Sequence, residues 1–113
     1  MHELALSQSI VDLVLERAGA ERLRTVTRVA VEVGAAAGVD PEALRFCFDL
    51  VVEETIARGA ELVIAAMPLR ARCRTCRHEF EPGTRFAPCP ACHRAGAQLV
   101  GGRELRVTAF DGE

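Results

Sequence analysis

Four cysteines in two closely spaced pairs constrain the fold of this chain more than any other feature. They form the segments Cys73-Arg-Thr-Cys76 and Cys89-Pro-Ala-Cys92, with twelve residues between the pairs. Each C-x-x-C pair places two thiolates on one side of a tight turn, and two such turns can face each other across one ion. Zn²⁺ suits four sulfur ligands because it is redox-inert and has no geometric preference from its d electrons. The spacing therefore predicts a tetrahedral zinc site.

Other chemistry is compatible with the same cysteines: two disulfides, an iron–sulfur cluster or a redox-active thiol pair. Disulfides are typical of exported chains, and the N-terminus shows no basic stretch followed by an apolar segment and a cleavage site. The string from Cys89 to His93 also reads C-x-x-C-H, but haem attachment to such a string requires export. His78 and His93 follow the two pairs, and each could act as an alternative zinc ligand when pH or metal load changes. Spacing favours zinc and leaves the iron–sulfur alternative open.

The composition is that of a folded intracellular chain. Half of the 113 residues are hydrophobic, 27% are charged, and the formal net charge is −2. No run of apolar residues approaches the ~20 that cross a bilayer, so we expect a cytoplasmic protein with no membrane partner. The negative charge and the 4% content of aromatic residues argue against nucleic acid as a partner. No phosphate-binding loop or nucleophile elbow is present, so we expect a binding protein and not an enzyme.

Hydrophobic periodicity predicts two helices and three strands. The helical pattern covers 4–18 and 41–57, and Asp40-Pro41 supplies a cap and a preset first turn for the second helix. Alternating apolar residues predict strands at 24–33, 61–70 and 97–110, with a bulge or bend at Gly101-Gly102 in the last strand. The cysteine-rich segment lies between the last two strands and contains little apolar material.

This order predicts an α+β fold in which two helices pack on a three-stranded sheet and an inserted four-Cys zinc-ribbon lobe projects from it. We expect an α/β domain at 1–70 and 97–113 and a zinc-binding domain at 71–96. Ser7 and Ser9 are predicted on the solvated face of the first helix. Cys47 is predicted on the apolar face of the second helix, where it packs in the core.

The first three residues, Met1-His2-Glu3, form a second candidate metal site. Met1 is expected to stay in place, because removal of the initiator favours a small second residue and His2 is large. The α-amine, backbone nitrogens and the His2 imidazole can then wrap one ion in fused rings, a planar nitrogen set that suits Ni(II) or Cu(II). The first N–H groups of a helix have no helical acceptor, so their deprotonation costs no helical hydrogen bond. Glu3 and Asp40 are acidic neighbours of this site, although Asp40 is assigned mainly to the helix cap.

With these features together, the chain resembles the HypA/HybF family of hydrogenase maturation nickel chaperones. The resemblance covers essentially the whole chain. It is carried by Met1-His2-Glu3-Leu4, Phe46-Cys47-Phe48, the two C-x-x-C pairs with their histidines, and Gly102-Arg103-Glu104-Leu105.

The resemblance implies a nickel-binding domain and a small zinc domain. It implies that Ni(II) is held by the amine of Met1, by backbone nitrogens near His2 and Glu3 and by the His2 side chain. Zinc would be held by Cys73, Cys76, Cys89 and Cys92. The implied partners are a HypB-type GTPase, a hydrogenase large subunit that receives the nickel and, in some relatives, urease maturation proteins. We expect a monomer or a weak homodimer.

Two other functions are compatible with the cysteine-rich segment. Arg70, Arg72, Arg74 and Arg77 cluster beside the cysteines, and a zinc ribbon could bind nucleic acid or a protein partner through them. We favour the simpler interpretation that these arginines compensate the negative charge of four thiolates around one zinc ion. The cysteines could also form a thiol redox switch, although zinc protects sulfur from oxidation.

Overall fold

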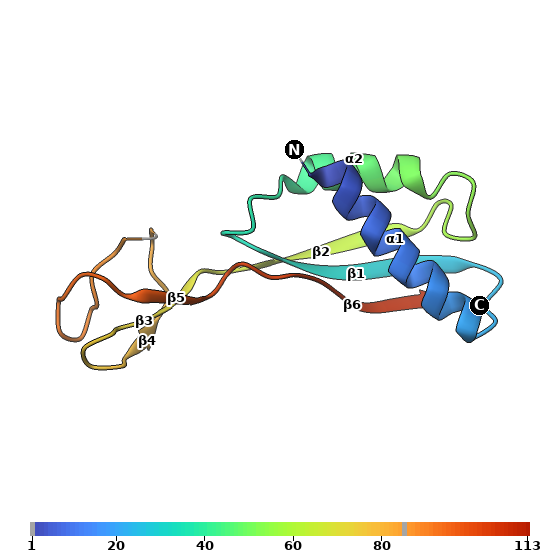
Figure 1. The fold of residues 1–113 in the computed structure, drawn as a ribbon. Helices are drawn as coiled ribbons and strands as arrows, with labels where there is room; N and C mark the ends of the chain where they lie inside the picture. The colour runs from blue at the N-terminus through green and yellow to red at the C-terminus, as the bar shows by residue number, and fades with distance from the viewer. Residues whose placement is uncertain (1, 85) are drawn as a thin grey trace. The chain divides into compact units, whose positions relative to one another are not determined.

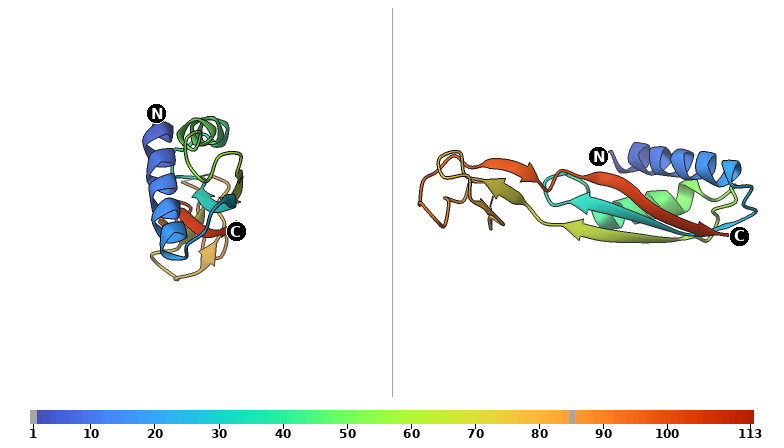
Figure 2. Two further views of the ribbon diagram at one scale, coloured as in Figure 1. Left: turned by 90° about the vertical axis from the view of Figure 1, so that its right-hand side faces the viewer. Right: turned by 90° about the horizontal axis from the view of Figure 1, so that it is seen from below.

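A computed structural model describes residues 2–84 and 86–113 (Figure 1). The helices are α1 (Glu3–Ala20) and α2 (Pro41–Val51). The longer strands are β1 (Val26–Gly34), β2 (Glu61–Met67) and β6 (Leu105–Gly112), which form a three-stranded sheet in the order β2-β1-β6. Figures 1 and 2 show both helices on the same side of this sheet. The predicted α+β fold is confirmed.

A second small sheet was not expected from the sequence. It consists of β3 (Arg70–Arg72), β4 (Glu79–Phe80) and β5 (Gln98–Gly101) in the order β4-β3-β5. Both pairings are antiparallel, and Ala71 lies opposite Phe80 on one side and Leu99 on the other. These strands are only two to four residues long, too short for a hydrophobic alternation to be recognised in the sequence.

Two of the predicted strands are therefore interrupted. The strand predicted at 61–70 ends at Met67, and the strand predicted at 97–110 is divided into β5 and β6. Pro68, which has no N–H to donate, follows the end of β2. Gly102 lies between β5 and β6 with a φ of 104°, which side chains rarely allow. The predicted bulge is confirmed, since the register between β3 and β5 shifts by one residue next to Gly101.

The described residues form two compact units. The first unit comprises Met1–Glu32, Gly38–Ala65 and Arg106–Glu113, and the second comprises Val33–Ala37 and Ala66–Leu105. The segment 71–96, predicted as the zinc domain, lies within the second unit. In the part of the chain that the structure describes, no helix is both long enough and apolar enough to cross a membrane.

The core of the first unit lies between the helices and the sheet. On α1, Ser7 is fully buried while Leu13 is 40% exposed. The prediction that Ser7 faces solvent is therefore wrong. Its hydroxyl donates a hydrogen bond to the carbonyl of Leu44 in α2 (3.1 Å), so the polar group is buried at little cost. The core side chains come from both helices, from β1 and β2 and from the turn after α2, and include Ile10, Val11, Val14, Val26, Val29, Val31, Leu44, Phe48, Val52 and Leu62.

The second helix begins where the sequence predicts and ends earlier. Asp40 caps it, and its carboxylate accepts the backbone N–H of Glu42 (3.0 Å). The prediction that the helix continues to residue 57 is wrong, because α2 ends at Val51. Beyond it, the Thr55 hydroxyl donates to the carbonyl of Val52 (2.8 Å) and accepts the N–H of Ala57 (3.0 Å). These local bonds replace the helical ladder.

Two phenylalanines in α2 provide a matched test of this core. Phe48 is fully buried, whereas Phe46 is 65% exposed. We expect Phe48→Ala to lower the free energy of unfolding by about 3–5 kcal/mol, because it leaves a cavity under α2. Phe46→Ala should change it by less than about 0.5 kcal/mol. Urea unfolding followed by far-UV circular dichroism measures both, and equal losses in the two variants would contradict the packing described here.

Candidate metal centre

The four paired cysteines converge in the second unit. The sulfur atoms of Cys73, Cys76, Cys89 and Cys92 all lie within 4.8 Å of one another. The Cys73–Cys92 sulfurs are 3.5 Å apart and the Cys76–Cys89 sulfurs 3.7 Å. A disulfide bond is about 2.05 Å long, and all of these cysteines are free thiols. The structure thus brings together all four predicted ligands without pairing them.

The spacing of the sulfurs fits a single ion with four thiolate ligands. Sulfurs placed about 2.3 Å from the centre of a tetrahedron are about 3.8 Å apart, close to the separations of 3.5 and 3.7 Å found here. A cluster of several irons and sulfides would hold its cysteines farther apart, because its own atoms lie between them. The geometry therefore favours one ion over a polynuclear cluster.

Each pair of cysteines lies in a turn of the same construction. The N–H of Cys73 donates to the carbonyl of His78 (2.9 Å), and the N–H of Arg77 donates to the carbonyl of Cys73 (3.0 Å). In the second turn, Cys89 donates to Arg94 (3.0 Å) and His93 donates to Cys89 (2.8 Å). Each of these residues in the first turn thus corresponds to the residue 16 positions later in the second turn.

This equivalence assigns different positions to the two histidines. His93 corresponds to Arg77, and both have a left-handed backbone, with φ of 64° and 63° respectively. His78 instead corresponds to Arg94, and its ring stacks on Phe80 with centroids 6.1 Å apart. Among the described residues, the group that could hold a metal contains the four cysteines and neither histidine. Their role as alternative ligands stays a prediction.

Backbone N–H groups point at the sulfur atoms and make the thiols unequal. Cys73 Sγ accepts from Cys76 (3.5 Å) and Thr75 (3.4 Å), and Cys89 Sγ accepts from Ala91 (3.4 Å). The N–H groups of Cys76 and Thr75 lower the pKa of Cys73 to about 6. The N–H of His78 lowers the pKa of Cys76, but partial removal from water and the neighbouring sulfurs outweigh it and raise that pKa to about 11. Four thiolates therefore need a cation to be held together.

One glutamate is placed among the arginines beside the cysteines. Glu79 in β4 pairs with Arg72 (3.0 Å) and Arg70 (3.3 Å) of β3. Hydrogen bonds from Arg72 and then from Arg70 lower the pKa of Glu79 below its ordinary value. These pairs are partly exposed, so water and salt screen them and they add little to stability. Their main effect is to join β3 to β4 next to the first turn.

At the other candidate site, the start of α1 lies against the start of α2. His2 is the N-cap residue and is exposed, and its side chain makes no capping hydrogen bond. Glu3 is only 8% exposed, and its carboxylate accepts the backbone N–H of Asp40 (3.1 Å). Met1 lies outside the described residues. The contact between Glu3 and Asp40 was not foreseen, because the sequence showed two acidic residues without showing that one binds the backbone of the other.

Cys47 does not belong to either candidate site. It lies in α2, half-buried and unpaired by disulfide. The distribution of the cysteines in the described chain therefore separates a group of four that share one centre from one that is part of a helix.

Fold and site together define a small α+β metal-binding protein with a four-thiolate centre carried on two C-x-x-C turns. Residues 1–112 match the family described as "Hydrogenase/urease nickel incorporation, metallochaperone, hypA". The chain belongs to the HypA family of hydrogenase maturation factors.

Relatives and solved structures agree with this assignment. The chain is 44% identical over 107 residues to "Hydrogenase maturation factor HypA" of Geotalea daltonii, covering 95% of this chain and 94% of the relative. It is 41% identical to the protein of the same name from Geobacter metallireducens, with each chain covered in full. The solution structure of the Ni metallochaperone HypA from Helicobacter pylori shares the fold, with a TM-score of 0.70 and 24% identity over 99% of this chain and 97% of that one. A second solution structure of a HypA protein matches with a TM-score of 0.77 and 25% identity, covering 100% of this chain and 97% of that one.

The backbone geometry of the second turn predicts how substitutions of His93 behave. Glycine tolerates a φ of 64° without strain, whereas a β-branched residue is disfavoured there by about 1–2 kcal/mol. We expect His93→Gly to bind Co(II), a spectroscopic probe of tetrahedral thiolate sites, at least as tightly as the wild type. His93→Val should bind it up to about tenfold more weakly.

Titration of the apo protein with Co(II), followed by sulfur-to-cobalt absorption, measures both affinities. His78→Ala serves as the control, because that residue has a different position in its turn. A large loss of affinity in His93→Gly would contradict a purely conformational role and would make the imidazole a ligand at neutral pH.

Proposed function

We propose that this protein binds Ni(II) at its N-terminus and delivers it to the large subunit of a nickel-containing hydrogenase. The ligands would be the α-amine of Met1, the backbone nitrogens of His2 and Glu3 and the His2 imidazole. A HypB-type GTPase would take part in the transfer. Membership of a nickel-incorporation family is the observation that carries this proposal. Hydrogenase is preferred to urease as the destination because the relatives are named hydrogenase maturation factors.

The beginning of α1 supports this assignment of the nickel ligands. The first helical acceptor is the carbonyl of His2, which receives the N–H of Leu6 (2.8 Å). The N–H groups of the first turn have no helical acceptor, so those of His2 and Glu3 can be deprotonated without opening the helical ladder. The His2 side chain is exposed and unused as a cap, which leaves its imidazole available to an ion.

Glu3 would contribute its backbone nitrogen and use its side chain for positioning. Its carboxylate is bound to the backbone N–H of Asp40, at the residue that caps α2. This contact holds the first turn of α1 beside the first turn of α2. Nickel ligands at His2 and Glu3 would then be attached to a helix whose start is fixed by a charge-assisted hydrogen bond.

We further propose that the ion in the four-cysteine centre is zinc and that its role is structural. The four sulfurs and their spacing fit a closed tetrahedral shell, which leaves no open position for substrate. Bound zinc would supply charge neutralisation and a rigid link between the two turns. The chain's own part is to present the sulfurs and to stabilise them with backbone N–H groups.

Nickel binding by untagged, zinc-loaded protein tests the first proposal. We expect His2→Ala to lower the affinity for Ni(II) by at least about tenfold, because the imidazole ligand is lost. One extra residue before Met1 should have a similar effect, because it removes the α-amine from its position. Calorimetric titration gives the affinity, and the absorption spectrum reports a planar, nitrogen-rich coordination. Binding should weaken as the pH falls, because protons compete for amine, imidazole and amide nitrogens.

The matched control is His78→Ala, which removes an imidazole from the second unit and should leave nickel affinity unchanged. Equal affinity for Ni(II) in the wild type and in His2→Ala would refute an N-terminal site. A lower affinity in His78→Ala alone would move the nickel site to the second unit.

Metal analysis of the purified protein tests the zinc proposal. We expect about one zinc per chain, and we expect Cys76→Ser to lower zinc affinity by more than about a hundredfold, since even loss of an outer hydrogen-bond partner costs 10–100-fold. Cys47→Ser should bind zinc like the wild type, because Cys47 lies outside the group of four. Competition with a chromophoric chelator measures the affinities. Iron in place of zinc, or unchanged affinity in Cys76→Ser, would contradict the proposal.

A further inference from the structure

Charge is divided very unevenly between the two units. The first unit contains seven arginines and thirteen acidic residues, for a formal net charge of −6. The second contains seven arginines and three glutamates, for a formal net charge of +4. The total of −2 for the whole chain conceals this difference. A strongly basic unit of about 45 residues attracts anionic partners over several ångströms.

The negative charge of a metal-bound cysteine site would neutralise only part of the positive charge of the second unit. Four thiolates around one divalent ion carry a net charge of −2. The second unit would therefore keep a formal charge of +2 with its metal bound. The second unit as a whole is therefore more basic than neutralisation of the site requires. The interpretation that the arginines beside the cysteines compensate the thiolates stays a prediction.

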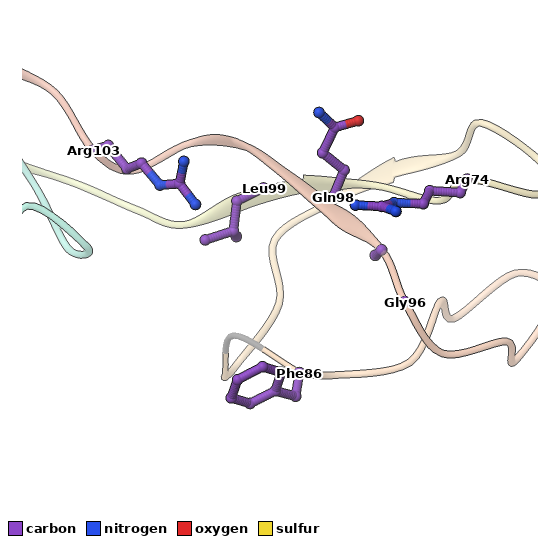
Figure 3. Close-up of a pocket in the computed structure, with 7 residues that line it drawn as sticks. Arg74, Phe86, Gly96, Gln98, Leu99 and Arg103 are labelled. Carbon is purple, nitrogen blue, oxygen red and sulfur yellow. The ribbon is translucent and has the colours of Figure 1, made fainter.

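Two of the arginines of the second unit, Arg74 and Arg103, line one open cavity. The cavity has a volume of about 560 Å³, and its lining residues are Arg74, Phe86, Gly96, Ala97, Gln98, Leu99 and Arg103. Figure 3 shows the guanidinium groups of Arg74 and Arg103 pointing toward each other along β5, while Phe86 lies on the loop that follows β4. A second cavity of about 250 Å³ shares Arg74 and Gln98 and adds Arg72 and Arg77.

The two arginines of the larger cavity differ from their neighbours in having no carboxylate partner. Arg70 and Arg72 are paired with Glu79. Among residues 2–84 and 86–113, no ion pair joins Arg74 or Arg103 to an acidic side chain. Guanidinium groups bind carboxylates through two parallel hydrogen bonds, a geometry that lysine does not offer. Two such groups directed into one cavity can accept carboxylates from outside.

Phe86 supplies an apolar contact in the same cavity. Its side chain is 89% exposed, the highest exposure among the large hydrophobic residues of the described chain. A phenylalanine so placed contributes little to the stability of its own unit. Aromatic and arginine side chains are the residues that most often carry binding energy at protein interfaces.

We propose that Arg74, Arg103 and Phe86 form a docking site for an acidic peptide segment of a partner protein, with an apolar side chain between its carboxylates. The cavity is large enough for a few side chains. A peptide fits better than nucleic acid, because one aromatic ring offers little stacking and the acidic first unit repels a long polyanion. The site lies entirely in the second unit, so it does not depend on where nickel binds.

Fluorescence anisotropy of zinc-loaded, nickel-free full-length protein tests this site. The probe is a short fluorescein-labelled peptide of glutamates flanking one leucine, compared with the same peptide carrying glutamines. We expect the glutamate peptide to bind with a dissociation constant below about 1 mM and the glutamine peptide to bind at least about tenfold more weakly. The double variant Arg74→Glu/Arg103→Glu should lose binding by at least about tenfold, and Phe86→Ser should weaken it several-fold.

The double variant Arg94→Glu/Arg58→Glu is the matched control. It makes the same change in net charge with arginines that do not line the cavity, and it should bind the peptide nearly as the wild type does. Retained zinc content confirms that each variant keeps its fold. The His2→Ala variant should bind the peptide normally, which separates this test from that of the nickel site.

Three results would overturn the proposal. One is the absence of binding by the glutamate peptide at millimolar concentration. Another is an equal loss in both double variants, which would indicate a general charge effect. The third is tighter binding of a single-stranded oligonucleotide than of the peptide, with dependence on the same arginines, which would assign the cavity to nucleic acid.

Discussion

The convergence of four thiols is the constraint on which the second unit depends. Its buried apolar side chains, in the described part of the chain, are Val33, Ala71, Cys73, Pro82 and Cys89. Two of these are candidate metal ligands, and the others are small or lie at the end of β1. Such a set cannot offset the conformational entropy of about forty ordered residues. A metal bound by the sulfurs would contribute its binding free energy directly to folding, which explains how two- to four-residue strands persist there.

The first unit is instead held together by a core of apolar side chains, and the sequence predicted most of its helices and strands. Its helices and strands have long periodic patterns, so their existence and order could be predicted from hydrophobicity alone. The errors arose where a polar side chain found a backbone partner that hydrophobic periodicity does not reveal. Ser7 reads as a solvated residue, yet the carbonyl of Leu44 satisfies its hydroxyl inside the core. The end of α2 was missed because Thr55 bonds to nearby backbone groups, and periodicity cannot reveal that competition.

The sequence predicted the four cysteine ligands of the candidate metal centre, but it did not predict how the two turns that carry them are built. The spacing of the cysteines identified all four sulfurs that the fold brings together. The same spacing places the two pairs 16 residues apart, but it did not reveal that the two turns share their hydrogen bonds and their left-handed residue. His78 is the second residue after its cysteine pair and His93 is the first residue after the other pair, and the backbone gives them correspondingly different positions. The two turns are equivalent in their hydrogen bonds and not in the types of their residues.

The two candidate metal sites differ in the property that separates a structural ion from a transferred one. The four sulfurs would complete the shell of a zinc ion. Cys73 and Cys89 are buried although Cys76 is exposed, so an ion there would exchange only when sulfur ligands are released. The proposed nickel ligands lie at the exposed start of a helix, and each must lose a proton or compete with one before it binds. With the proposed ligands, partner contact or a modest fall in pH would therefore release the nickel ion while leaving the zinc ion in place. A protein that keeps one metal and hands over another requires this difference in exposure and proton competition. In this chain it would arise from the proposed sulfur ligation of zinc in the second unit and the proposed nitrogen ligation of nickel in the first.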